Sequence, residues 1–222
     1  MAGSGQVETY TADLSHLTDV EGLAKAVIKE HNKLDVLINN AGVLKIANPR
    51  TEDGLDARFA VNTYAPYLLT QRLLPLLGTT GRVLNLSSAA QSPVDKKALA
   101  GKVELSDEMS AYGQSKLAIT MWSRHLALSL KSKGPMIVAI NPGSLLGSKM
   151  VKEGFGIDGK DLNIGADILI RATLSDEFAN ASGKYFDNDA GQFASPHADA
   201  LNPSKCEKIV RVIEEVLAEL VS

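Results

Sequence analysis

The sequence predicts an α/β protein: a doubly wound parallel sheet in three layers (αβα), with helices on both faces of the strands. Two observations support this prediction. Strand-like and helix-like segments alternate along the chain. The strand-like segments are almost continuously apolar, which is typical of parallel strands buried on both faces. We expect one domain over residues 1–222.

Each expected element rests on a local pattern. The pattern of residues 7–12 predicts a strand. Thr18 and Glu21 have the spacing of a capping box, which predicts the start of the first helix. Apolar runs and helical periodicity then predict strand 34–39, a long helix 54–77, strand 81–87, helix 110–130, strand 136–140, helix 164–174 and strand 184–186. Asn202 and Pro203 are typical of a helix start and predict a terminal helix.

Composition restricts the class of partner. With 45% hydrophobic and 22% charged residues and a net charge of -3, the chain gives no reason to expect nucleic acid. The start of the chain lacks a basic leader, and no apolar run approaches the roughly 20 residues that span a bilayer. Cys206 is the one cysteine, which suits a reducing compartment. We expect a cytoplasmic protein that binds small molecules and no membrane.

Small or polar residues follow three of the expected strands. The segments after them are Asn39 to Gly42, Ser87 to Ser88, and Asn141 to Gly143. Each segment alone could be an ordinary turn. Ligands of doubly wound sheets bind beyond the carboxyl ends of the strands, so three such ends side by side predict a single cleft.

Tyr112 and Lys116 are the candidate chemical pair. Four positions apart on a helix, the phenol and the ammonium share one face. We expect the positive charge to lower the phenol pKa, so that Tyr112 can exchange protons with an alcohol or a carbonyl near neutral pH. A surface tyrosine beside a lysine would show the same spacing.

Pro66 lies inside the long expected helix and has no N–H for the carbonyl of Asn62. That carbonyl is therefore a candidate hydrogen-bond acceptor for an ordered water in a proton relay. The alternative is a kink tolerated for packing.

Together these residues make the sequence resemble the short-chain dehydrogenase/reductase family, whose fold is Rossmann-like. The resemblance rests on Asp13 to Ser15, Asn39 to Gly42, Asn62, Leu86 to Ser88, the Tyr112 to Lys116 motif and Asn141 to Gly143, in the family's order. The long stretch between Ser88 and Tyr112, with residues 182–186, looks like the retinol dehydrogenase-like and WW-domain oxidoreductase-like branch.

The resemblance implies hydride transfer between NAD or NADP and an alcohol or carbonyl. Tyr112 would be the general acid/base, and Lys116 would lower its pKa and hold the nicotinamide ribose. Ser88 would bind the substrate oxygen, and Asn62 would hold the relay water. No metal is implied. Met150, Val151, Phe155 and Ile157 hint at an apolar ligand.

The resemblance also implies the cofactor contacts. Asp13 and Leu14 would contact the adenine. The adenosine ribose would be lined by Asn40, Ala41 and Gly42, and the nicotinamide flanked by Pro142, Gly143, Ser144 and Leu145. Ser148 stands where the family commonly has a threonine that holds the nicotinamide carboxamide, so it would be the substitute for that residue. The family's helices corresponding to 54–77 and 110–130 commonly pair across a homodimer, so Leu117, Met121, Trp122 and Leu128 could form an interface or the core.

One departure affects the expected function. The family's first two strands and the glycine-rich turn between strand and helix are missing, and Gly3 and Gly5 cannot replace them because no strand precedes them. We expect an incomplete version of a longer gene product, with strand 34–39 as an unpaired apolar edge and weakened cofactor binding. Two alternatives to an oxidoreductase remain: a cofactor-independent isomerase or dehydratase, and a noncatalytic fragment.

Overall fold

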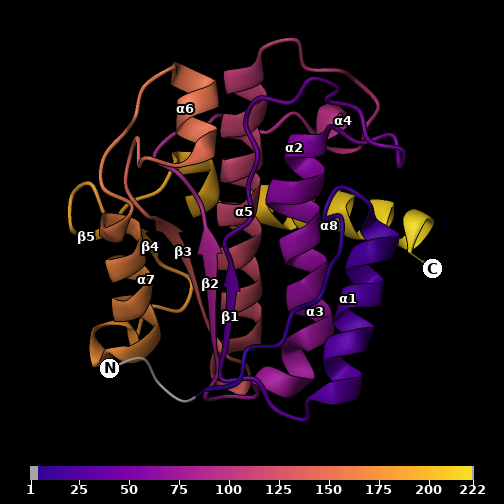
Figure 1. Cartoon of the computed structure of the whole chain (residues 1–222). Coiled ribbons are helices and arrows are strands. Elements are labelled where there is room, and N and C mark those ends of the chain that lie inside the picture. The colour runs from indigo at the N-terminus through magenta and orange to yellow at the C-terminus, as the bar shows by residue number, and fades with distance from the viewer. Residues whose placement is uncertain (1–4, 222) are drawn as a thin grey trace.

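The computed structural model describes residues 5–221, and its centre is a five-stranded sheet in the order β1-β2-β3-β4-β5 (Figure 1). The strands are β1 Val36–Asn39, β2 Arg82–Leu86, β3 Met136–Asn141, β4 Tyr185–Asp187 and β5 Gln192–Ala194. The first four run parallel, and β5 returns antiparallel to β4. The predicted parallel sheet is confirmed, and β5 is an addition that the sequence patterns did not predict.

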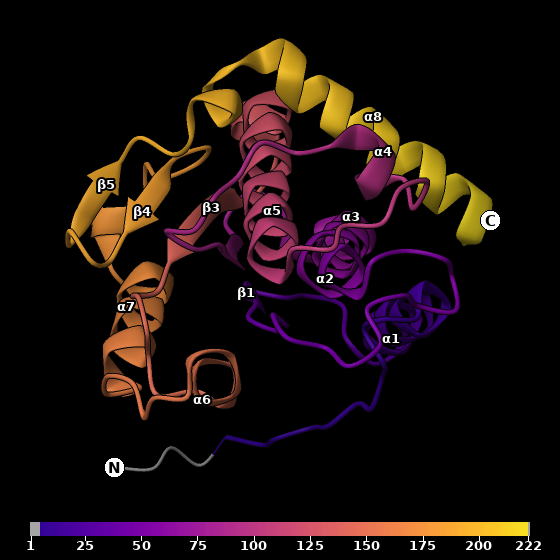
Figure 2. The same ribbon diagram turned by 90° about the horizontal axis from the view of Figure 1, so that it is seen from above.

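Helices cover both faces of the sheet (Figure 2). One face carries α1 Leu17–Glu30, α3 Ala65–Leu77, α5 Glu108–Leu130 and, outside α5, α8 Pro203–Leu220. The other face carries α6 Lys149–Phe155 and α7 Asn163–Leu174. The short helices are α2 Ala57–Phe59 and α4 Lys96–Leu99, with 3-10 turns at Lys131–Lys133, Asp176–Phe178 and Ala198–Leu201. This arrangement confirms the three-layer α/β architecture.

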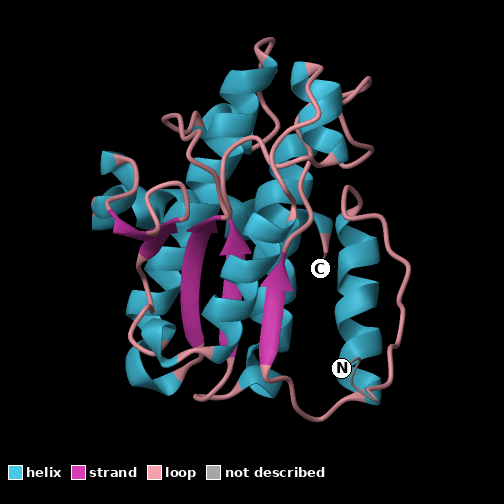
Figure 3. Ribbon diagram, turned by 60° about the vertical axis from the view of Figure 1, so that its left-hand side comes forward, coloured by secondary structure: helices cyan, strands magenta, loops and turns pink. Residues whose placement is uncertain are grey.

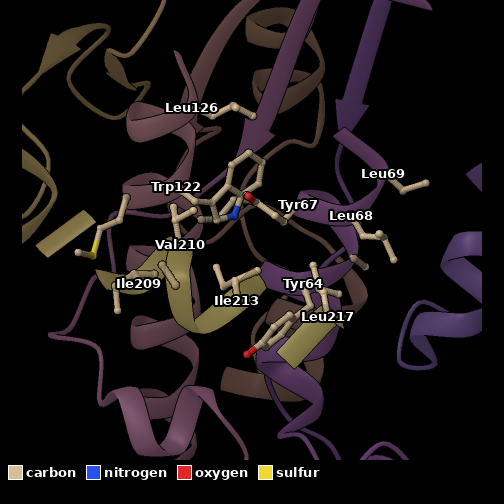
Figure 4. Close-up of a cluster of buried hydrophobic side chains, with 14 of the residues drawn as sticks. Tyr64, Tyr67, Leu68, Leu69, Trp122, Leu126, Ile209, Val210, Ile213 and Leu217 are labelled. Atoms are coloured by element: carbon tan, nitrogen blue, oxygen red, sulfur yellow. The ribbon is translucent and has the colours of Figure 1, made fainter. Parts of the chain in front are cut away.

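The larger core lies between the sheet and the layer of α3, α5 and α8. Val83 and Ile137 point into it from neighbouring strands. Figure 4 shows Ile213 of α8 beside Tyr67 and Trp122, whose rings meet edge to face at 5.4 Å. Because α8 covers this face, Leu117, Met121 and Trp122 belong to the core, as one of the two interpretations had it. Leu128 is 51% exposed, and the homodimer stays a prediction.

The smaller core lies on the opposite face of the sheet. Leu84 and Ile140 of the sheet pack there against Ile168 of α7 and against Phe178 and Phe186. The aromatic rings of Phe178 and Phe186 lie 5.0 Å apart. Apolar burial on both faces explains why these strands read as continuous apolar runs.

The open edge of the sheet is β1. Its outer side pairs with no strand of the described residues, and Ile38 is 41% exposed. The predicted apolar edge is therefore confirmed. The predicted strand at residues 7–12 is wrong: the segment is exposed and forms no ladder, with Val7 87% exposed (Figure 3). A strand needs a neighbour for its N–H and C=O groups, and none lies beside this segment. Gly5, just before this segment, is also exposed and in no strand, and Gly3 lies outside the described residues.

Two helix starts differ from the prediction. The capping box is wrong, because α1 begins at Leu17 and the N–H of Leu17 donates to the Asp53 carboxylate at 3.0 Å. Glu21 instead pairs with Arg72 at 2.7 Å.

The long helix expected at 54–77 is three pieces. Asp56 caps α2, a π-helical turn follows at Ala60–Tyr64, and α3 completes the run. In the π turn the N–H of Ala65 reaches back five residues to the carbonyl of Ala60. A π turn accommodates the missing N–H of Pro66 and is often found at functional sites.

In the part of the chain that the structure describes, every helix is either too short or too polar to cross a membrane. Within residues 5–221 the His, Cys, Asp and Glu side chains also form no group suited to holding a metal ion.

Candidate active site

The structure brings four predicted residues together beyond the carboxyl ends of β1 and β2. Tyr112 and Lys116 come from α5, Ser88 follows β2, and Asn62 lies in the π-helical turn. Contacts link Tyr112 to Ser88 and to Lys116, and the turn after β1 to Asn62 and Lys116. These four side chains therefore form one cluster at the strand ends, and the predicted cleft beside them stays a prediction.

The Tyr112 phenol faces the hydroxyl of Ser88. Tyr112 is half-buried, and this burial raises its pKa above the ordinary value of 10.0, while the hydrogen bond with Ser88 lowers it in part. The expectation that Lys116 lowers the Tyr112 pKa is thus wrong for this structure. The Lys116 Nζ lies 5.7 Å from the centre of the Tyr112 ring, but burial penalises both charged forms.

Lys116 is the most deeply buried charged side chain of this cluster, with 3% of its surface exposed. Its Nζ donates a hydrogen bond to the carbonyl of Leu86 at 2.7 Å. Burial lowers the pKa of Lys116 to about 8. Neutral pH is therefore close to the pKa of Lys116. Any further hydrogen-bond acceptor brought into the site would favour the charged form.

The two adjacent serines have different roles. The Ser87 hydroxyl is buried and contacts Thr120 Oγ1 at 2.7 Å and the Lys116 carbonyl at 3.0 Å. It joins β2 to α5. The Ser88 hydroxyl accepts a 3.1 Å hydrogen bond from the N–H of Ala90, so its own O–H can still donate a hydrogen bond to another group.

Asn62 acts through its side chain as a clamp. Its Oδ1 accepts from the N–H of Val43 at 2.8 Å, and its Nδ2 donates to the Val43 carbonyl and to Ser115 Oγ, each at 2.9 Å. The clamp joins the turn after β1 to α5. Ser115 was missed by the sequence analysis, although it lies between Tyr112 and Lys116 in the quoted motif.

The turn after β1 approaches the ammonium closely. A Cβ on Gly42 would lie 3.4 Å from both Asn62 Oδ1 and Lys116 Nζ. Asn40 and Ala41, next to it, are exposed. Because glycine has no side chain, the space beside the Lys116 Nζ stays accessible to a ligand.

The turn after β3 is fixed by the chain that follows β4. Asn141 Nδ2 donates to Asp187 at 2.8 Å and to Asp189 at 2.9 Å, and the Ser144 N–H donates to Asp189 at 2.9 Å. Asn188 Nδ2 donates to the Pro142 carbonyl at 2.9 Å. Burial alone would raise the pKa of Asp189, but the hydrogen bonds from Ser144 and Asn141 and the nearby Lys160 hold it below its ordinary value.

Asp187, Asn188 and Asp189 were also missed. They directly follow the expected strand 184–186, so the rule that selects polar residues at strand ends could have found them. Gly143 in the anchored turn has a φ of 127°, a conformation that favours glycine.

Leu145 and Ser148 lie where the chain leaves this turn. Leu145 has a φ of 57°, in the left-handed region, a strain of about 1 to 3 kcal/mol for a non-glycine residue. Ser148 caps α6, since its Oγ accepts from the N–H of Val151 at 3.3 Å. Its role toward a carboxamide stays a prediction.

Asp13 and Leu14 are not joined to the cluster. The Asp13 carboxylate accepts two hydrogen bonds from Ser15, at 2.8 and 2.7 Å, and these lower its pKa. Leu14 packs against the larger core. The turn that they form before α1 lies at the same end of the sheet as the site (Figure 1). Their contact with adenine stays a prediction.

A parallel sheet with a tyrosine, a serine and a buried lysine at its strand ends defines the class of the protein. The chain belongs to the short chain dehydrogenase family, whose model matches residues 1–155. The predicted family and its retinol dehydrogenase-like branch are confirmed.

Two relatives from mouse are similar to this chain. Retinol dehydrogenase 13 is 31% identical over 212 residues, which cover 87% of this chain and 64% of the relative. Retinol dehydrogenase 12 is 31% identical over 233 residues, which cover 96% of this chain and 71% of the relative. The chain thus spans a little under two thirds of the length of mouse retinol dehydrogenase 13.

Solved structures show the same fold. An uncharacterized protein from Mycobacterium paratuberculosis superposes with a TM-score of 0.78 at 24% identity, over 96% of this chain and 76% of the other. A short chain dehydrogenase from Burkholderia cenocepacia in complex with NADP gives a TM-score of 0.58 at 25% identity, over 80% of this chain and 73% of the other.

Proposed function

We propose that the chain supports an oxidoreductase activity, in which a hydride passes between NAD or NADP and an alcohol or carbonyl substrate. The observation that carries the proposal is the Tyr112 phenol facing the Ser88 hydroxyl, one helical turn from the buried Lys116. The named activity of the retinol dehydrogenases and the NADP complex of the Burkholderia protein support it.

The residues around Lys116 fit the nicotinamide end of such a cofactor. Within the described residues, Lys116 Nζ donates to one protein acceptor, the Leu86 carbonyl, so two of the three ammonium N–H groups can reach ribose hydroxyls. Gly42 leaves that approach open. When bound, a nicotinamide nucleotide would supply or accept the hydride.

Tyr112 and Ser88 would carry the proton chemistry. In the reduction of a carbonyl, the Tyr112 phenol donates its proton to the substrate oxygen, and in the oxidation of an alcohol the phenolate takes that proton back. The Ser88 hydroxyl donates a hydrogen bond to the same oxygen and stabilises the negative charge that develops there. Ribose hydroxyls that accept hydrogen bonds from the Lys116 Nζ would raise the charged fraction of this lysine.

The pyrophosphate end has a weaker fit. Between residues 5 and 35, the structure describes an exposed segment and α1, with no turn from a strand to a helix that could hold a phosphate. We therefore expect weak cofactor binding by this chain alone, and micromolar affinity in a calorimetric titration with either cofactor would contradict that expectation.

We further propose an apolar substrate. The Met150 methyl lies 3.5 Å from the position of a Cβ on Gly42, and Phe155 and Ile157 are 47% and 42% exposed nearby in sequence. The choice between the two cofactors, the cytoplasmic location and the homodimer all stay predictions.

The test is turnover of apolar aldehydes and alcohols, followed by the absorbance of the reduced nicotinamide. Tyr112→Phe should abolish turnover. Tyr64→Phe is the matched control, because it removes a buried tyrosine hydroxyl that donates to the Leu99 carbonyl at 2.8 Å, away from the cleft. Equal activity of Tyr112→Phe and the wild type would overturn the proposal, and so would no turnover at saturating cofactor.

A further inference from the structure

We propose that Tyr185 and Gln91 are positioning residues that hold Ser88 against Tyr112. The inference deepens the proposed function and rests on it for the role of Ser88. The backbone carbonyl of Ser88 accepts two side-chain hydrogen bonds. Tyr185 OH donates at 3.1 Å and Gln91 Nε2 donates at 3.0 Å.

The two donors are themselves fixed by the fold. Tyr185 is 5% exposed and lies in β4, where it pairs with Ala139 of β3 on one side and Ala194 of β5 on the other. Gln91 Oε1 accepts from the N–H of His197 at 3.0 Å. The C-terminal part of the chain therefore holds the loop that carries Ser88, across 97 residues of sequence in the case of Tyr185.

The same loop is held on its other side by α5. The Ser92 N–H donates to the Gly113 carbonyl at 3.1 Å, and a Cβ on Gly113 would lie only 2.7 Å from Ser92 Oγ. Gly113 directly follows Tyr112. Contacts from β4 on one side and from α5 on the other thus fix the distance between the Ser88 hydroxyl and the Tyr112 phenol.

The Tyr185 hydroxyl stays protonated at neutral pH and can donate this hydrogen bond there. Burial and the charge of Asp187 raise the pKa of Tyr185 above its ordinary value of 10.0, so its hydroxyl keeps its proton. A phenylalanine at position 185 would keep the ring and remove only the donor. The Ser88 carbonyl would then depend on Gln91 alone, and the serine would lose part of its fixed orientation.

The experiment compares Tyr185→Phe and Gln91→Met with Tyr64→Phe, which also loses a buried hydrogen bond from tyrosine to a carbonyl. Each variant should lose stability, measured as a lower urea midpoint of unfolding, and Gln91→Met should lose the most because it also removes the acceptor of the His197 N–H. Only Tyr185→Phe and Gln91→Met should lower kcat, by about fivefold to tenfold. Their KM for the cofactor should stay unchanged, because neither residue contacts Lys116 or Gly42.

A second readout does not need turnover. In the chain labelled with ¹³C at the tyrosine ζ carbon, the pH titration of Tyr112 should move to higher pH in Tyr185→Phe, toward the value of Ser88→Ala. It should not move in Tyr64→Phe. This shift is expected because the hydrogen bond with Ser88 lowers the Tyr112 pKa.

The two readouts separate the two proposals. If the wild type turns over substrate and Tyr185→Phe matches Tyr64→Phe in both kcat and the Tyr112 titration, the positioning role is refuted and the oxidoreductase stands. If the wild type shows no turnover, the proposed function fails, and the Tyr112 titration alone decides whether Tyr185 positions Ser88.

Discussion

Lys116 and Tyr112 lie one turn apart on α5, with the Lys116 Nζ 5.7 Å from the centre of the Tyr112 ring. Burial nevertheless shifts the pKa of each residue in the direction that favours its neutral form. The pKa of Lys116 falls to about 8 and that of Tyr112 rises. A ligand with hydroxyl groups could therefore form hydrogen bonds with both groups, in place of the water that each lost on folding.

The depressed pKa of Lys116 gives the first prediction. A lysine whose pKa is lower in the folded than in the unfolded chain destabilises the fold while both states are protonated, and the penalty disappears as pH rises from about 8 through 10.5. Lys116→Met should therefore raise the unfolding free energy at pH 7, by at most about 3 kcal/mol, less the lost bond to Leu86. The gain should vanish above the ordinary lysine pKa.

Urea unfolding across this pH range measures the effect. Lys25→Met is the control, because Lys25 is 74% exposed on α1 and should change stability little at any pH. A gain for Lys116→Met that does not depend on pH would contradict the prediction and would point to packing of the apolar side chain.

The strands and strand ends could be predicted from the sequence because they depend on local patterns. The apolar runs that became β2 and β3 are buried on both faces, Ser88 lies two residues after β2, and Asn141 is the last residue of β3. Three features could not be predicted in this way. The strand at residues 7–12 needs a neighbour, Tyr185 reaches Ser88 across 97 residues, and the pKa of Tyr112 depends on burial.

Gly42 gives the second prediction, which concerns cofactor binding. A Cβ at this position would make ordinary contacts of 3.4 Å, so Gly42→Ala should fold with the stability of the wild type. It should bind NAD or NADP more weakly, because the methyl group occupies the approach to Lys116. Gly22→Ala on α1, where a Cβ meets nothing within 4 Å, should leave binding unchanged.

Fluorescence titration of the reduced nicotinamide measures both affinities. If Gly42→Ala binds as well as Gly22→Ala does, the cofactor does not pass beside Gly42, and its predicted place after β1 is wrong.

The open edge at β1 gives the third prediction. Ile38 is 41% exposed at an edge that pairs with no strand of residues 5–221, an arrangement that favours association between sheet edges. Ile38→Lys should therefore reduce self-association on concentration. Ile28→Lys is matched in exposure, at 43%, but lies on α1 and should have a smaller effect. Light scattering over a concentration series measures this, and equal effects of the two lysines would show that net charge is responsible.

The anchored turn after β3 gives the last prediction. The pKa of Asp189 is lower in the folded chain than the ordinary value of 3.8, so its stabilising effect is present above that value and is lost as pH falls through the folded pKa. Asp189→Asn should lower stability at pH 7, by about 1 kcal/mol, because the amide cannot accept from Ser144 and Asn141 as a carboxylate does. The difference from the wild type should shrink below pH 3.8.

Thermal unfolding between neutral and acid pH measures this difference. Asp158→Asn is the matched control, since Asp158 is 98% exposed and lies, like the anchored turn, between β3 and α7. It should follow the wild type throughout. If Asp189→Asn also follows the wild type at pH 7, the Asp189 carboxylate does not hold the turn, and the position of Pro142 to Ser144 must be fixed by the bonds from Asn141 to Asp187 and from Asn188 to the Pro142 carbonyl.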